Sequence, residues 1–177
     1  VRDSIGNYMK INSVYALDGY DPATGAVDKQ RGISELKKIV ENTLGIPIHY
    51  HALVNFQLFT DTIDLLGGIN VNVETAFTDY NYPIEGKENA EPESERYLKV
   101  HFDAGLQRMD SKTALIFSRS RKGTNDEGTD FARAKRQQKV ILAIRDKILS
   151  AGTLFNPIKL KELYDNYKDS VETNISF

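Results

Sequence analysis

The sequence contains no cysteine among its 177 residues, which excludes disulfides, zinc–thiolate sites and thiol nucleophiles from its chemistry. It also has no apolar run long enough to span a membrane and no signal peptide. The first residue is Val1 and not an initiator methionine. We therefore expect the chain to be a piece of a longer protein, truncated at its N-terminus, so the lack of a membrane span or signal peptide in it says little about location.

The sequence also lacks a strong excess of either charge. Its 23 Lys and Arg residues and 25 Asp and Glu residues give a net charge of −2, so no overall attraction to nucleic acid or to an anionic membrane is expected. The charge is segregated, because the segment from Arg119 to Lys147 holds nine basic and four acidic residues. Any electrostatic function is therefore expected to be local, and nucleic acid is not expected as a partner.

Apolar periodicity predicts one α/β domain, because strand-like and helix-like segments alternate along the chain. Gly45 is the expected stop of an early helix, and Asp110 is the expected cap of a later one. The expected helices cover residues 29–44, 57–66, the segment that runs into Arg119 and a long segment that ends near Leu149, and the expected strands cover 46–56, 69–73 and 97–102. Residues 77–96 are expected as a surface excursion and residues 104–110 as a turn. The expected apolar stripe of the long helix is Phe131, Ala134, Ile141, Ile144 and Ile148.

Two groups of basic residues flank one polar loop. Arg119 and Arg121 are two residues apart, so in an extended segment their side chains point to the same face. Arg133, Arg136 and Gln137 share one face of the helix that follows. Because the guanidinium fork is always charged and can bind two phosphate oxygens, these residues predict a phosphate or pyrophosphate site. The alternative is that the arginines form the solvated face of an amphipathic helix.

The order of these motifs, ALIFSRSR followed by TDFARAKRQQ, resembles the signature of the LytR–CpsA–Psr family of bacterial cell-envelope proteins. Near the N-terminus, Arg2-Asp3-Ser4 and Lys10-Ile11-Asn12 resemble two further elements of that family. The resemblance extends from Arg2 to about Ile175. It implies that residues 1–177 form a single α/β domain, with a mixed central sheet flanked by helices and an apolar cleft for a polyprenyl tail.

The resemblance also implies an enzyme, a phosphotransferase that attaches a polyprenyl-pyrophosphate-linked glycopolymer to a cell-wall acceptor such as peptidoglycan. Such an enzyme would work at the extracytoplasmic face of the bacterial membrane, held by an anchor that this chain lacks. The alternative is a non-catalytic binder of polyprenyl (pyro)phosphate lipids or wall glycans. We expect an apolar channel, lined by the helices near residues 29–44 and 57–66, to open at the arginines.

The family pattern assigns a role to particular residues. The implied pyrophosphate-binding residues are Arg119, Arg121, Arg133, Arg136, Gln137, Lys10 and Asn12, and the implied catalytic residues are Arg2, Asp3, Arg119, Arg121 and Asp130. Asp130 would hold an arginine or help with a proton or a metal, although its position also suits a helix N-cap. The family's magnesium-linked aspartates belong to elements that precede Val1, so we expect the Mg²⁺ ligands to lie outside this chain.

Overall fold

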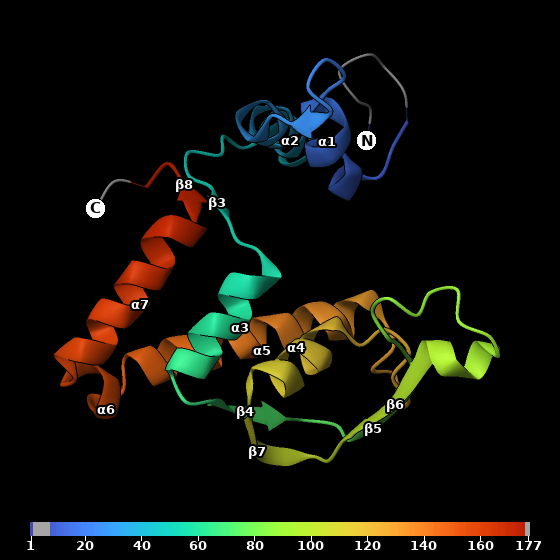
Figure 1. Ribbon diagram of the computed structural model, residues 1–177, viewed down its shortest axis with the longest axis vertical. Coiled ribbons are helices and arrows are strands. Elements are labelled where there is room, and N and C mark those ends of the chain that lie inside the picture. The colour runs from blue at the N-terminus through green and yellow to red at the C-terminus, as the bar shows by residue number, and fades with distance from the viewer. Residues whose placement is uncertain (2–7, 176–177) are drawn as a thin grey trace. The chain divides into compact units, whose positions relative to one another are not determined.

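Each of two compact units of the chain has its own helices and strands. We analysed a computed structural model, which describes residue 1 and residues 8–175, without the side chains of residues 12, 169 and 170 (Figure 1). One unit contains residues 1–52 and 173–177, and the other contains residues 53–172. None of the helices in the described residues combines the length and the apolar content that crossing a membrane requires.

The smaller unit is built on two helices, α1 (Ile11–Gly19) and α2 (Lys29–Leu44), with the short strands β1 (Tyr20–Asp21) and β2 (Ala26–Val27) between them. Asp28 caps α2 by accepting a hydrogen bond from the backbone of Arg31 at 3.0 Å. Gly45 ends the helix in the left-handed conformation, with φ of 71°. The predicted helix and its stop residue are therefore confirmed.

The strand predicted over residues 46–56 is wrong for most of its length. Only β3 (Ala52–Leu53) is a strand, and helix α3 (Phe56–Leu65) begins three residues later. Side chains bind the polar backbone groups just before β3. Asn174 accepts from His51 N at 2.9 Å and donates to His49 O at 2.7 Å, and the hydroxyl of Thr173 donates to His51 O at 2.6 Å. This backbone is satisfied without a longer strand ladder.

The larger unit contains a long antiparallel ribbon made of two strand pairs in succession. The pairs are β4 (Ile69–Val73) with β7 (Gly105–Met109), and β5 (Phe77–Pro83) with β6 (Tyr97–Phe102). Val73 lies opposite Gly105, and Phe77 lies opposite Phe102, so the second pair continues the first with a small register shift (Figure 1). The α/β class is confirmed, and these four strands form the ribbon in place of the expected central sheet.

Two of these strands lie where no strand was predicted. β5 occupies the start of the expected surface excursion, and β7 occupies the expected turn. Phe77 and Asp79 alternate with exposed or half-buried residues, and Met109 is buried at the end of β7. The backbone of β5 pairs with β6, and the backbone of β7 pairs with β4. This pairing stabilises both segments as strands although they contain polar residues. Asp110 caps the following helix, as predicted, by accepting from Thr113 N at 2.8 Å.

Helices α4 (Ser111–Arg119) and α5 (Asp130–Ile148) pack over the ribbon. The rings of Phe77, Phe102 and Phe117 lie 5.1–6.0 Å apart and join ribbon to helix. The remaining elements of this unit are η1 (Glu93–Arg96), α6 (Ala151–Leu154), α7 (Pro157–Ser170) and the first residue of β8 (Glu172–Thr173). The buried core consists of Ile63, Leu66, Ile69, Val71, Val73, Phe77, Phe102, Met109, Ala114, Phe117 and Val140.

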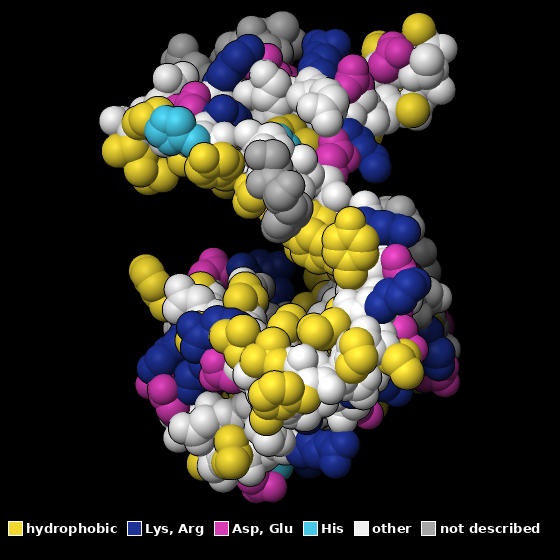
Figure 2. All heavy atoms as spheres, turned by 90° about the vertical axis from the view of Figure 1, so that its left-hand side faces the viewer, with side chains coloured by type: hydrophobic (Ala, Val, Ile, Leu, Met, Phe, Trp, Pro, Cys, Tyr) yellow, Lys and Arg dark blue, Asp and Glu magenta, His cyan; other side chains and the backbone are white. Residues whose placement is uncertain are grey.

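The predicted apolar stripe of α5 is wrong at three positions, because Phe131, Ala134 and Ile141 are exposed. Phe131 is 89% exposed and Ile141 is 62% exposed, whereas Val140 is 1% exposed. Val140 follows Phe131 by nine residues, which at 3.6 residues per turn places it on the opposite side of the helix. The buried side also carries Arg136, so a search for apolar residues alone misplaces the stripe. Figure 2 shows that hydrophobic side chains remain at the surface of this unit, next to Lys and Arg.

Candidate functional site

A cavity of about 520 Å³ lies within the larger unit, between α3, α4, α5 and the end of β5. Its apolar walls are Val54, Phe56, Phe59, Tyr82, Pro83, Leu115, Val140 and Ile141. Its polar lining is Asn55, Ser118, Arg119, Arg121, Arg133 and Gln137. The structure therefore brings four of the predicted site residues to one cavity that also has an extended apolar wall.

The ends of two helices place these side chains. Arg119 is the last residue of α4, and Ser120 then leaves the helix with φ of −52° and ψ of 136°. Helix α5 begins after Thr129, whose hydroxyl accepts from Ala132 N at 3.2 Å. Arg133 and Gln137 are four residues apart on this helix, so both can face the same cavity. The cavity thus joins the C-terminal end of α4 to the first turns of α5.

The charges of the lining favour an anion. The guanidinium carbon of Arg119 lies 4.8 Å from the centre of the Phe56 ring. Arg133 binds the carboxylate of Asp130 at 2.9 Å. Among the described residues, neither Arg119 nor Arg121 forms an ion pair, and no carboxylate lines the cavity. The lining therefore carries uncompensated positive charge beside apolar walls.

Tyr82 adds a phenol to the same lining. Burial raises the pKa of Tyr82 above its ordinary value, and the nearby negative charges of Glu85 and Asp79 act in the same direction. The positive charge of Arg119 opposes this shift only in part. The hydroxyl therefore stays protonated at neutral pH and is available as a hydrogen-bond donor.

Asp79 of β5 is a component of the site that the sequence analysis missed. Its side chain is 1% exposed, and its Oδ2 accepts hydrogen bonds from Ser120 Oγ, Arg121 N and Lys122 N at 2.6, 3.1 and 3.1 Å. Burial raises the pKa of Asp79, but these hydrogen bonds and one from Asn81 outweigh it, so the pKa lies below its ordinary value. A buried carboxylate thus holds the turn that carries Arg119 and Arg121.

The signal that could have revealed Asp79 lies in its own segment. Residues 77–82 read FTDYNY, which is rich in aromatic and β-branched residues and therefore typical of a strand. In a strand, residues 77 and 79 point to the same face, so a buried Phe77 would have implied a buried Asp79. A buried carboxylate needs hydrogen-bond donors, so a buried Asp79 would have predicted a nearby turn that offers free N–H groups.

Arg136 does not line the cavity, which corrects the prediction that it shares a substrate-binding face with Arg133. It is 3% exposed, and its Nε donates to Phe117 O at 2.9 Å. Its Nη1 donates to both the carbonyl and the carboxylate of Glu127, and its Nη2 donates to Ser120 O at 2.6 Å. Because its donors are engaged within the protein, Arg136 stabilises the loop between α4 and α5 and is not free to bind a ligand.

Asp130 also lies outside the cavity lining. It is the first residue of α5, and the N-cap is Thr129 rather than Asp130. Its side chain is 79% exposed and binds Arg133. Of the roles considered for it, holding an arginine is the one that the geometry displays, and its participation in catalysis stays a prediction.

The remaining predicted residues lie near the N-terminus. Lys10 precedes α1 and belongs to the smaller unit, so its role stays a prediction. Arg2 and Asp3 lie outside the described residues, as does the side chain of Asn12. Of the two helices expected to line an apolar channel, α3 contributes Phe56 and Phe59 to the cavity, and the part expected of α2, which belongs to the smaller unit, stays a prediction.

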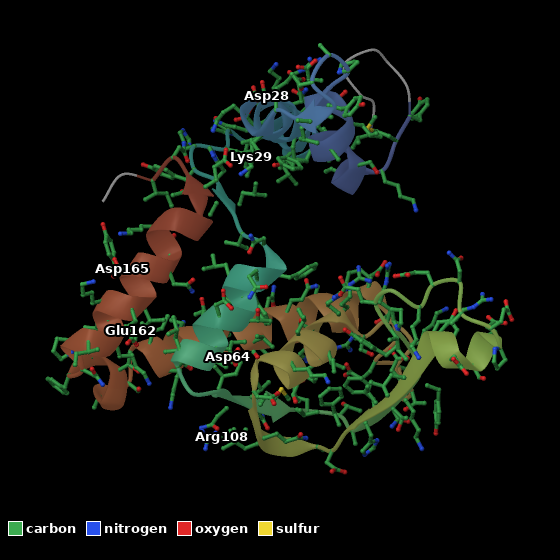
Figure 3. All side chains as sticks on the ribbon, viewed as in Figure 1. Asp28, Lys29, Asp64, Arg108, Glu162 and Asp165 are labelled. Atoms are coloured by element: carbon green, nitrogen blue, oxygen red, sulfur yellow. The ribbon has the colours of Figure 1, made fainter. Side chains whose placement is uncertain are left out.

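Magnesium has no candidate ligand set in the described part of the chain. No group of three or more His, Asp or Glu side chains there is arranged to hold a metal ion. An open hollow between α3 and α7 has acidic walls, which include Asp64, Glu162 and Asp165 (Figure 3). Asp165 in this hollow is paired with Lys161 and Lys168. The described residues therefore do not fit a magnesium site.

Comparison with known proteins identifies relatives along the whole chain. A family model described as "LytR_cpsA_psr family" matches residues 1–177. The polyisoprenyl-teichoic acid–peptidoglycan teichoic acid transferase TagV of Bacillus subtilis (strain 168) is 31% identical over 173 residues, which are 98% of this chain and 37% of TagV. The transferase TagU of the same organism is 29% identical over 97% of this chain and 44% of its own length. The chain thus spans less than half of these relatives.

Solved structures agree with this relationship. The crystal structure of B. subtilis TagV is similar with a TM-score of 0.60 and 29% identity, over 98% of this chain and 54% of that one. The crystal structure of B. subtilis TagU gives a TM-score of 0.58 and 28% identity, over 97% and 59%. The fold and the sequence point to the same group of proteins, and the chain belongs to the LytR–CpsA–Psr family.

Proposed function

We propose that this protein is a phosphotransferase that attaches a polyprenyl-pyrophosphate-linked glycopolymer to a cell-wall acceptor such as peptidoglycan. The observation that carries the proposal is one cavity whose lining combines three arginines with apolar side chains. The names of TagV and TagU describe transfer of teichoic acid from a polyisoprenyl carrier to peptidoglycan, which supports the same class of reaction for this chain.

The polar and the apolar residues of the cavity lining suit the two parts of such a donor. A polyprenyl chain is stabilised by leaving water, at about 25 cal/mol per Å² of apolar surface, and Phe59, Leu115 and Val140 offer it an apolar wall. A pyrophosphate needs several oriented donors, and Arg121 and Arg133 can each bind two of its oxygens. A donor that is both apolar and anionic matches this cavity better than either part alone would.

In the proposed reaction, a hydroxyl group of the acceptor attacks the sugar-side phosphorus. A new bond forms between the acceptor oxygen and that phosphorus, the bond to the bridging oxygen breaks, and polyprenyl phosphate leaves while the hydroxyl proton is released. Negative charge develops on the bridging oxygen and spreads over the transferred phosphoryl group. Arg119, Arg121 and Arg133 would stabilise this charge, because oriented donors in a site with little water act strongly on a charged transition state.

The proposal includes the setting in which this reaction takes place. We place the protein at the extracytoplasmic face of the bacterial membrane, because its polyprenyl-linked donor is a membrane lipid. A membrane anchor and Mg²⁺ remain proposals that rest on the family resemblance. Any magnesium ligands would have to come from residues outside the described ones.

One observation favours a second candidate, a non-catalytic binder of polyprenyl pyrophosphate lipids. The described cavity lining has no carboxylate and no imidazole that could accept the proton of the attacking hydroxyl. A binder would retain the apolar walls and the arginines without needing such a base. Turnover is therefore the measurement that separates the two candidates.

The test is to incubate the full-length protein with a synthetic polyprenyl-pyrophosphate-linked glycan and peptidoglycan oligomers, with and without Mg²⁺. Transferase activity predicts a phosphodiester-linked product and free polyprenyl phosphate, both detectable by mass spectrometry. Binding without product would favour the second candidate. In crystals soaked with polyprenyl pyrophosphate, density for phosphate between Arg121 and Arg133 is expected, and a lipid bound elsewhere would contradict both candidates.

A further inference from the structure

The loop that follows Arg119 and Arg121 is attached to strand β5 by backbone and side-chain hydrogen bonds. Thr124 N donates to Thr78 O, and Thr78 N donates to the Thr124 hydroxyl, both at 3.0 Å. Asn125 Nδ2 donates to Ala76 O at 2.7 Å, and Asp79 forms an isolated antiparallel bridge with Gly123. The loop after α4 therefore runs along β5 as an additional short edge.

Asp79 binds the part of this loop that directly follows α4, residues 120–122. Its Oδ2 accepts from the hydroxyl of Ser120 and from the backbone N–H groups of Arg121 and Lys122, while its Oδ1 accepts from Asn81 N at 2.9 Å. Ser120 is fully buried, and Asp79 does not line the cavity. The Asp79 carboxylate thus contacts the backbone of the arginine-bearing turn outside the cavity lining, so an anion bound in the cavity would not touch this carboxylate.

We propose that Asp79 is a positioning residue for anion binding: it fixes the backbone of residues 120–122 so that Arg119 and Arg121 face the cavity together. This inference rests on the proposed function, because it assigns the cavity a pyrophosphate. Asp79 itself does not line the cavity, so its proposed role is indirect.

The sign of the effect distinguishes positioning from simple electrostatics. A carboxylate close to a cationic cavity repels an anion, so replacing it with a neutral group should strengthen anion binding if charge alone matters. If Asp79 positions the turn, the same replacement should weaken binding although a repulsive charge is lost. The two interpretations therefore predict changes of opposite direction.

The substitution Asp79→Asn tests this in the full-length protein, with inorganic pyrophosphate as the probe and calorimetry as the readout. The amide has the shape of the carboxylate but only one acceptor oxygen, so its NH2 group must face either Asn81 N or the donors of the turn. We expect pyrophosphate binding to weaken roughly tenfold, as when one charge-assisted hydrogen bond is lost. Unchanged or tighter binding by a folded Asp79→Asn protein would overturn the inference.

Two further variants make the test independent of general damage. Glu74→Gln removes one negative charge from the same unit, at a carboxylate that binds Lys135 and Lys139 and does not touch the turn, so its pyrophosphate affinity should stay within about twofold of the parent. If Asp79→Asn does not fold, Ser120→Ala removes one of the three bonds to Oδ2 and leaves the charge in place. That variant should bind pyrophosphate several-fold more weakly, and parental affinity would overturn the inference.

The parent protein separates failure of the inference from failure of the proposed function. If the parent binds pyrophosphate and the Asp79→Asn protein binds it equally well, the inference fails and the proposed function stands. If the parent itself does not bind pyrophosphate, the anion site fails and the inference fails with it.

Discussion

The carboxylate of Asp79 and the guanidinium group of Arg136 bind the same buried residue, Ser120, through opposite chemistry. Asp79 Oδ2 accepts from the Ser120 hydroxyl at 2.6 Å, and Arg136 Nη2 donates to the Ser120 carbonyl at 2.6 Å. One group comes from β5 and the other from α5. The end of α4 is therefore held through hydrogen-bond donors and acceptors of Ser120, next to Arg119 and Arg121.

Arg136 should be essential for stability even though it does not line the cavity. Arg136→Lys retains the positive charge but cannot reach Phe117 O, Ser120 O and Glu127 together. We expect the free energy of unfolding in urea to fall by about 2–4 kcal/mol, because buried carbonyl groups lose their partners. The matched change Arg145→Lys, on an exposed helix position, should alter it by less than about 0.5 kcal/mol. Equal effects of the two changes would contradict this role.

Glu74 should make stability depend on pH in the acidic range. Hydrogen bonds from Lys135 and then Lys139 lower the pKa of Glu74 from 4.5 to about 2. Because the pKa is depressed in the folded protein, the carboxylate stabilises the fold above about pH 4.5, and this stabilisation disappears as the pH falls toward 2. The difference in unfolding free energy between the parent and Glu74→Gln should therefore shrink over that interval.

NMR titration of the Glu74 side-chain carboxyl measures the same quantity directly. A midpoint near the ordinary value of 4.5 would show that the two lysines do not hold the carboxylate in solution. Added salt should also reduce the difference between the parent and Glu74→Gln at neutral pH, because the group is exposed and its ion pairs are screened.

Gly32 allows α1 and α2 to approach each other closely. A Cβ atom at this position would lie 2.4 Å from the carbonyl oxygen of Tyr15, which is backbone and cannot turn away. Gly32→Ala should therefore destabilise the smaller unit by roughly 1–3 kcal/mol, with faster hydrogen exchange in α1 and α2. Gly152→Ala is the control, since a Cβ there meets no atom within 4 Å, and it should be neutral or slightly stabilising. Parental exchange rates in Gly32→Ala would contradict the close approach.

The parts of the fold that local signals determine were predictable from the sequence. Helix α2 follows its apolar period from Lys29 to Leu44 between an Asp cap and a left-handed glycine, and strand β4 follows strict alternation. The aromatic and β-branched residues of 77–82 indicate a strand, but periodicity alone does not identify the partners of Asp79, whose donors lie more than forty residues away in the sequence. Strand pairing between distant segments is the information that local periodicity lacks.

The candidate site shows the same division. Spacing placed Arg133 and Gln137 on one face of a helix, and both line the cavity. Spacing alone also placed Arg136 with them, because it cannot distinguish an arginine that faces a cavity from one that is buried against carbonyl groups. Only tertiary structure reveals whether the five donors of a guanidinium group are already engaged.

Arg121 should separate catalysis from binding, because Arg121→Lys keeps the charge and removes the planar fork. If Arg121 positions the phosphoryl group in the transition state, turnover by the full-length protein should fall by roughly a hundredfold, the cost of one lost oriented donor. Binding of the lipid-linked donor should weaken much less, since a point charge still attracts the pyrophosphate. The measurement is kcat and donor affinity with a synthetic lipid-linked glycan and peptidoglycan, with Arg145→Lys as the control for the same chemical change outside the cavity. Turnover of Arg121→Lys within about twofold of the parent would mean that this arginine binds the donor but does not stabilise the transition state.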